Sequence, residues 1–145
     1  MFGLSDSPVR VIRAILLLTL VSGLAGLGGE LLLLEHFEDW RQKLPLGLIA
    51  LGLLVLAWHG VDRRGAPVRA LQLLMVVYIG AGAIGMTLHY QGNVEFELEL
   101  RPSLAGLELF KKSIMGATPA LAPGSMIQLA LIGLAYCHKH PRLEP

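Results

Sequence analysis

Long apolar runs separated by short polar clusters make up most of this 145-residue chain. About 20 apolar helical residues cross a hydrocarbon core of about 30 Å, so such runs predict membrane spans. Three runs have the required length on their own, at about 14–34, 44–61 and 70–89. The last run, 126–137, reaches it only as 118–137, with an irregular entry at Pro119 and Pro123. The pattern therefore predicts four spans.

Composition supports a membrane protein and narrows the function classes. The chain is 54% hydrophobic and 16% charged, with a formal net charge of +1, whereas an average soluble domain is about 25% charged. These values exclude a disordered chain, a basic nucleic-acid-binding domain and most soluble enzymes. The single cysteine, Cys137, excludes an intrachain disulfide framework.

The predicted fold is an all-α membrane protein, one integral membrane domain over 1–145, in which four transmembrane helices form an antiparallel bundle. Lys and Arg beside the spans favour cytoplasmic termini by seven to five. The seven inner residues are Arg10, Arg13, Arg63, Arg64, Arg69, Lys139 and Arg142. Short loops are compatible with a bacterial cytoplasmic membrane, which is where we expect the protein.

The outer loop, 90–117, is the only sizeable region predicted outside the membrane. Its first part alternates apolar and charged residues, which is typical of a half-buried strand. An unpaired strand edge needs a partner, so a docking row is predicted at Val94, Phe96, Leu98 and Leu100. The alternative is a short helix, which would place Glu95 and Glu99 one turn apart.

The second part of the outer loop predicts an amphipathic helix over 104–115, with Ser103 as its N-cap and Gly116 at its end. Its apolar residues share one face, and Glu108, Lys111 and Lys112 face elsewhere. Such a helix between two spans is expected to lie along the bilayer surface. A lid or a docking surface is the functional alternative.

Small residues form a stripe on two of the spans, where they would let helices approach closely. The stripes are Thr19, Ser22, Gly23, Gly26 and Gly29 in the first span, and Tyr78, Gly82 and Gly85 in the third. Glu30 continues the first stripe and His89 the second, both toward the outer side. A carboxylate and an imidazole are therefore expected to face one another.

An ionisable residue inside a span suggests a function, because isolated charge in hydrocarbon is costly. Glu30, His89 and the nearby His36 are the candidates for a proton or cation relay. The structural alternative is that Glu30 is protonated or paired, or lies near the interface, and only sets the helix register. Imidazole and carboxylate groups also suit a divalent metal, but the Glu-x-x-His repeat of di-iron bundles is missing.

The histidines fall into two tiers, one at each end of the spans, as a two-haem bundle would require. The inner tier is His59, His138 and His140, and the outer tier is His36 and His89. All lie at or beyond the span ends, where histidine is more often an interfacial anchor. Tyr136 and Cys137 are expected only to pack. No cofactor is predicted, and haem or a divalent metal stays an alternative.

No catalytic motif is present in the sequence. We therefore expect a small non-enzymatic accessory or assembly subunit of a larger membrane complex, whose partners are the lipid bilayer and other membrane subunits or copies of itself. The first alternative is a small oligomeric proton or cation transporter that uses Glu30 and His89. The second is a haem- or metal-binding redox protein. No nucleic-acid partner is expected.

Overall fold

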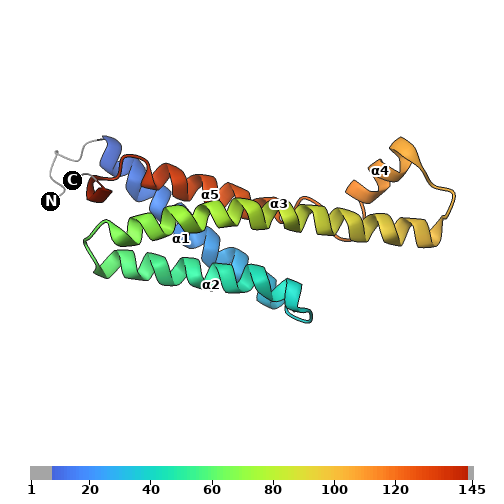
Figure 1. Cartoon of the computed structure of the whole chain (residues 1–145), viewed down its shortest axis with the longest axis horizontal. Helices are drawn as coiled ribbons and strands as arrows, with labels where there is room; N and C mark the ends of the chain where they lie inside the picture. The colour runs from blue at the N-terminus through green and yellow to red at the C-terminus, as the bar shows by residue number, and fades with distance from the viewer. Residues whose placement is uncertain (1–7, 144–145) are drawn as a thin grey trace. The chain divides into compact units, whose positions relative to one another are not determined.

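The structure, a computed structural model, describes residues 8–143. Over that range it contains five α-helices, one short 3₁₀ helix and no strand (Figure 1). The elements are α1 (Pro8–Leu33), α2 (Trp40–Val61), α3 (Ala66–Leu100), α4 (Gly106–Ile114), α5 (Gly124–Cys137) and η1 (Pro141–Leu143). The predicted all-helical class is confirmed for these residues.

Three helices, α1, α2 and α3, are long and apolar enough to cross a membrane. Many of their large apolar side chains are exposed, as lipid-facing residues would be. The shorter α5 is apolar but has only 14 residues, which at 1.5 Å per residue is about 21 Å. The chain is thus compatible with an integral membrane protein.

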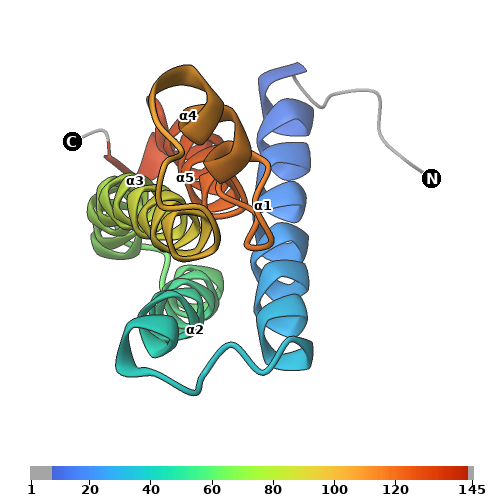
Figure 2. The same ribbon diagram turned by 90° about the vertical axis from the view of Figure 1, so that its right-hand side faces the viewer.

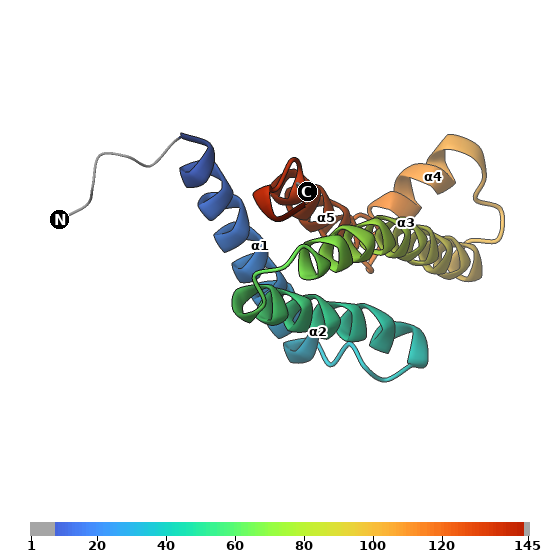
Figure 3. The same cartoon turned by 60° about the vertical axis from the view of Figure 1, so that its left-hand side comes forward.

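The described residues divide into two compact units. The first comprises residues within Met1–Val77 and Leu129–Pro145, and the second is Tyr78–Gln128. In the first unit, α2 and the start of α3 run antiparallel (Figures 1 and 3), and α1 crosses them obliquely (Figure 2). A Cβ on Gly28 of α1 would lie 3.1 Å from Ile49 of α2, so the two helices are in close contact there.

The helix α2 begins one turn before the predicted residue 44. Asp39 is its N-cap, and the Gln42 side chain accepts hydrogen bonds from the backbone N–H groups of Glu38 and Asp39 at 2.9 and 3.2 Å. These bonds satisfy donors that the helix itself cannot pair. Pro45 consequently lies inside the helix, whereas a start at residue 44 would have placed it in the first turn.

The predicted strand after residue 93 is wrong. Residues 90–100, assigned from the sequence to an outer loop, continue α3 to Leu100. Glu and Leu fill five of the seven positions 94–100, and both are better helix formers than strand formers. An ion pair between Glu97 and Arg101, one turn apart, adds to the helix end. Glu95 and Glu99 therefore lie one turn apart, as in the helical alternative.

The helix predicted over 104–115 is present in the second unit but is shorter, as α4. Its N-cap is Ala105, not Ser103, and Gly106 adopts a φ of +60°, which suits glycine. The helix ends at Ile114 with Met115 as its C-cap, before the predicted Gly116. It folds back beside the end of α3 (Figure 1).

Asn93 connects α3 to the end of α4 and to the segment that follows α4. Its side-chain amide donates to the carbonyl oxygens of Ser113 and Thr118 at 2.9 and 2.7 Å, and its oxygen accepts from the Thr118 N–H at 3.2 Å. Asn93 is only 3% exposed. Three hydrogen bonds from one buried amide thus hold the chain on both sides of Gly116 against α3.

Candidate functional site

The densest group of buried polar side chains lies in the first unit, where α2 and α5 end. His59, Tyr136 and His140 are all buried there. Their ring centroids are 5.6 Å apart for His59–Tyr136, 5.5 Å for His59–His140 and 5.2 Å for Tyr136–His140. His59 continues the buried face of α2 formed by Ile49, Gly52 and Leu56, so helical periodicity carries a polar ring into the packed side.

Arg142 of η1 connects this cluster to the end of α2. Its Nη1 donates to the carbonyl oxygens of His59 and Asp62 at 2.9 and 3.1 Å and lies 3.0 Å from His59 Nδ1. A guanidinium can only donate, so Nδ1 accepts and the neutral His59 ring carries its proton on Nε2. Nε2–H then donates to Tyr136 Oη at 2.5 Å. Tyr136 therefore keeps its own O–H to donate elsewhere.

His140 is held in the neutral form by the same segment. Its Nδ1 accepts a hydrogen bond from the Arg142 backbone N–H at 3.2 Å, which leaves the ring proton on Nε2. Burial lowers the pKa of His140, and the charges of Arg13 and Arg142 lower it further. In this cluster the uncharged rings therefore present N–H and O–H donors beside permanently charged arginines.

We expect the stability of the protein to fall as the pH drops below about 6.5, the ordinary pKa of histidine. Because the folded-state pKa of His140 is lowered, the unfolded chain takes up the proton first, and stability is full above that pH and lost below it. Thermal unfolding in detergent between pH 7.5 and 5.5 measures the slope of stability against pH. His140→Gln should flatten it, and His138→Gln, at an exposed histidine, should not. An unchanged slope in His140→Gln would contradict the assignment.

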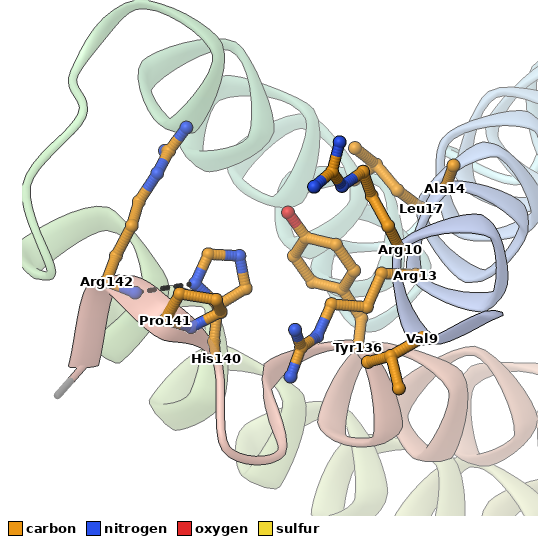
Figure 4. Close-up of a pocket in the computed structure, with 9 residues that line it drawn as sticks. All are labelled: Val9, Arg10, Arg13, Ala14, Leu17, Tyr136, His140, Pro141 and Arg142. Atoms are coloured by element: carbon orange, nitrogen blue, oxygen red, sulfur yellow. Dashed lines mark hydrogen bonds between the residues drawn. The ribbon is translucent and has the colours of Figure 1, made fainter. Parts of the chain in front are cut away.

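An open pocket of about 460 Å³ adjoins the cluster. It is lined by Val9, Arg10, Arg13, Ala14, Leu17, Tyr136, His140, Pro141 and Arg142. The Tyr136 ring lies between His140 and the two α1 arginines (Figure 4). Arg13 Nη2 donates to the carbonyl oxygens of His138 and Lys139 at 3.2 and 2.6 Å, so the turn after α5 holds this guanidinium at the pocket.

The residues predicted to form a relay are in different units. Glu30 is exposed on α1 and His36 is partly exposed in the turn after it, both in the first unit. His89 is in the second unit, where its Nδ1 lies 3.1 Å from the carbonyl oxygen of Pro119. That oxygen only accepts, so Nδ1 carries a proton. The facing of Glu30 and His89 stays a prediction.

Metal and haem ligation stay alternatives for the two histidine tiers. Within residues 8–143 no three His, Cys, Asp or Glu side chains are grouped closely enough to hold a metal ion. In the inner tier, both ring nitrogens of His59 are hydrogen-bonded to protein atoms. An iron ligand at His59 would have to displace either Tyr136 or Arg142.

The four residues predicted as a docking row do not form one row on a helix. Val94 and Leu98 share one face of α3 and are half-buried, and Phe96 and Leu100 share another and are exposed. A period of two places alternate residues on one face of a strand but about 200° apart on a helix. The docking role stays a prediction, and only Phe96 and Leu100 present an open apolar surface.

Sequence reasoning misses the cluster and its pocket. It uses Arg10 and Arg13 only to orient the chain, treats His59 and His140 as interfacial anchors, and expects Tyr136 only to pack. The one available signal is that basic residues before 14–34 and after 118–137 meet at the same end of the predicted bundle. Comparison with known protein families, curated proteins and solved structures gives no match for this chain.

Proposed function

We propose that the protein is a non-enzymatic accessory or assembly subunit of a larger membrane complex, in the bacterial cytoplasmic membrane. In this proposal the fourth span is 118–137, both termini are cytoplasmic, and the helices form an antiparallel bundle. The exposed Leu107 and Phe110 of α4 support an interfacial position for that helix on the outer side.

The observation that carries the proposal is a face of α1 that packs against nothing in the described chain. Ser22, Gly26 and Gly29 are exposed on this face. A Cβ on Gly26 or Gly29 would meet no atom of the described residues within 4 Å. By contrast, a Cβ on Gly23 would collide with Leu129, and one on Gly28 would touch Ile49. The first small-residue stripe is thus divided between a face that packs against the described chain, at Gly23, and an exposed face, at Ser22, Gly26 and Gly29.

Gly26 and Gly29 lie within a regular helix and have no positive φ that would require glycine. Glycine inside a helix costs about 1 kcal/mol relative to alanine, and no contact within residues 8–143 offsets that cost. Close packing with a helix of another chain would offset this cost, because small residues let two helix backbones approach closely. Ser22 Oγ already donates to the carbonyl oxygens of Leu18 and Thr19. The face from Ser22 to Gly29 therefore carries only small, uncharged side chains.

Glu30 lies beside Gly29 on the same exposed side of α1. A carboxyl group facing hydrocarbon is unfavourable by several kcal/mol unless it is paired or close to the interface. A partner helix that covers Gly26 and Gly29 would also supply a neighbour for this group. The same face thus combines close approach with a polar group, the two features that drive helix association in lipid.

The test is co-purification of the tagged chain from its native membrane in mild detergent, with mass spectrometry of what accompanies it. We expect one or more larger membrane proteins at stoichiometric amount. In the double variant Gly26→Leu/Gly29→Leu their yield should fall about fivefold or more, which corresponds to losing roughly 1 kcal/mol of packing. Gly80→Leu is the matched control, because a Cβ there also meets no atom of the described chain within 4 Å.

Two outcomes would contradict the proposal. A chain that purifies alone, at wild-type yield in both variants, would show that the exposed face binds lipid only. A homo-oligomer without other proteins would instead favour the transport alternative. In that case Glu30→Gln and His89→Gln in a liposome flux assay would be the decisive measurements.

A further inference from the structure

We infer that the pocket beside the histidine and arginine cluster binds a phosphate-bearing anion, with the headgroup of an anionic membrane lipid as its source. The lining residues belong to α1, the end of α5 and η1, all in the first unit. This inference does not depend on the proposed accessory function, because the pocket and the exposed glycine face use different residues.

The charge of the lining is entirely positive. Arg10, Arg13 and Arg142 all border the pocket, and none of its nine lining residues is acidic. The Arg142 guanidinium is directed toward the end of α2, so the two α1 arginines are the ones placed to contact a ligand (Figure 4). Arg10 and Arg13 are three residues apart on one helix and therefore lie on the same side. Guanidinium groups bind phosphate oxygens through paired, charge-assisted hydrogen bonds. Such a lining repels cations and favours an anion.

The neutral polar groups of the lining are donors as well. The Tyr136 O–H is left to donate because its oxygen already accepts from His59. His140 carries its ring proton on Nε2 because Nδ1 accepts from the Arg142 backbone. A ligand in contact with these groups must supply acceptors. A phosphate has several acceptor oxygens and no need for a donor, so it complements this set.

The apolar part of the lining favours a lipid over a free phosphate. Val9, Ala14 and Leu17 line the same pocket. A second, adjoining hollow on α1 shares Arg10 and Ala14 and is lined further by Val11, Ile15 and Leu18. Ile15 and Leu18 are exposed. An acyl chain could follow these side chains, whereas inorganic phosphate would gain nothing from them.

The position of Arg10 and Arg13 along α1 also corresponds to the depth of a lipid headgroup. Arg10 and Arg13 come directly before the apolar run that begins at Ala14. In a membrane-spanning helix this boundary lies at the polar interface, where phosphate groups and basic side chains meet. The turn after α5 fixes the Arg13 guanidinium there through two carbonyl oxygens. The site is thus preorganised at headgroup depth.

The test uses the full-length protein in mild non-ionic detergent and native mass spectrometry of retained lipid. We expect phosphatidylglycerol to be retained in clear preference to zwitterionic phosphatidylcholine. Arg10→Gln should weaken phosphatidylglycerol retention about tenfold, as expected for losing one charge-assisted contact. Arg64→Gln is the matched control, since it removes the same charge from an exposed residue of the same unit outside the pocket.

A second measurement needs no variant. Phosphatidylglycerol with a photoreactive group near the headgroup should label the peptide that contains Val9–Leu17 in the wild-type protein. Equal retention of the two lipids, equal losses in Arg10→Gln and Arg64→Gln, or labelling only elsewhere would overturn the inference. Displacement of phosphatidylglycerol by millimolar inorganic phosphate, without labelling of that peptide, would support the phosphate chemistry and overturn the lipid source.

Discussion

Gly82→Leu is expected to destabilise the second unit by about 3 kcal/mol or more, the upper range for overpacking a tightly packed site. A Cβ at Gly82 would already lie 2.9 Å from the carbonyl oxygen of Pro123 and 2.7 Å from a side-chain carbon of Ile127. The first of these is backbone and cannot rotate away. The segment before α5 would therefore have to leave α3. Hydrogen–deuterium exchange of residues 117–128 measures this release.

Gly80→Leu is the control for this prediction, because it lies two residues away on the same helix with open space around its Cβ position. It changes hydrophobicity and helix propensity by the same amount without the collision. Its exchange pattern should match that of the wild-type protein. Equal protection in the two variants would show that the close approach at Gly82 does not hold this segment.

Asn93→Leu is expected to release α4 and the residues after it, at a cost of roughly 3 kcal/mol or more. The substitution keeps similar volume but removes three hydrogen bonds, so two carbonyl oxygens and the Thr118 N–H lose this partner. A buried group left unsatisfied costs about 1–3 kcal/mol. Limited proteolysis in detergent should then cut between 101 and 123 much faster than in the wild-type protein.

Gln91→Leu is the matched control, because Gln91 is exposed on the same helix and the change of residue type is nearly the same. It should be cut at the wild-type rate. If Asn93→Leu is also cut at that rate, the amide hydrogen bonds do not hold the segment, and α4 is held by its apolar contacts alone.

The close packing of α3 in the second unit was largely predictable. The sequence places Gly82 and Gly85 on one face with His89. In the structure this face packs against the segment 119–127, since a Cβ at Gly85 would lie 2.8 Å from the side chain of Pro123 and His89 contacts the carbonyl oxygen of Pro119. Small residues one turn apart in an apolar run are a local signal of close approach. Which segment packs against this face is decided by residues distant in the sequence, so no local pattern indicates it.

The end of α3 shows why a pattern of period two was misleading. Alternation of apolar and charged residues over 94–101 fits a half-buried strand, but the residue types favour a helix. Helix propensity and the ion pair of Glu97 with Arg101 are contributions to helix stability from residues close in the sequence. The hydrogen bonds of Asn93 to residues 20 and 25 positions later are tertiary terms. Both sets favour the helix, and no second strand is present in the described residues to pair with an extended chain.

The sequence by itself determined the helical class, the three long apolar helices and the clustering of charges between them, because length, hydrophobicity and helix propensity are properties of contiguous residues. Only the tertiary structure decided which face of α1 is covered and which is open, and that His59 meets Tyr136 beside the arginines. In lipid, a residue that faces acyl chains and one that faces another helix are equally apolar. The hydrophobic pattern therefore cannot distinguish them, and the contacts between distant segments must be seen.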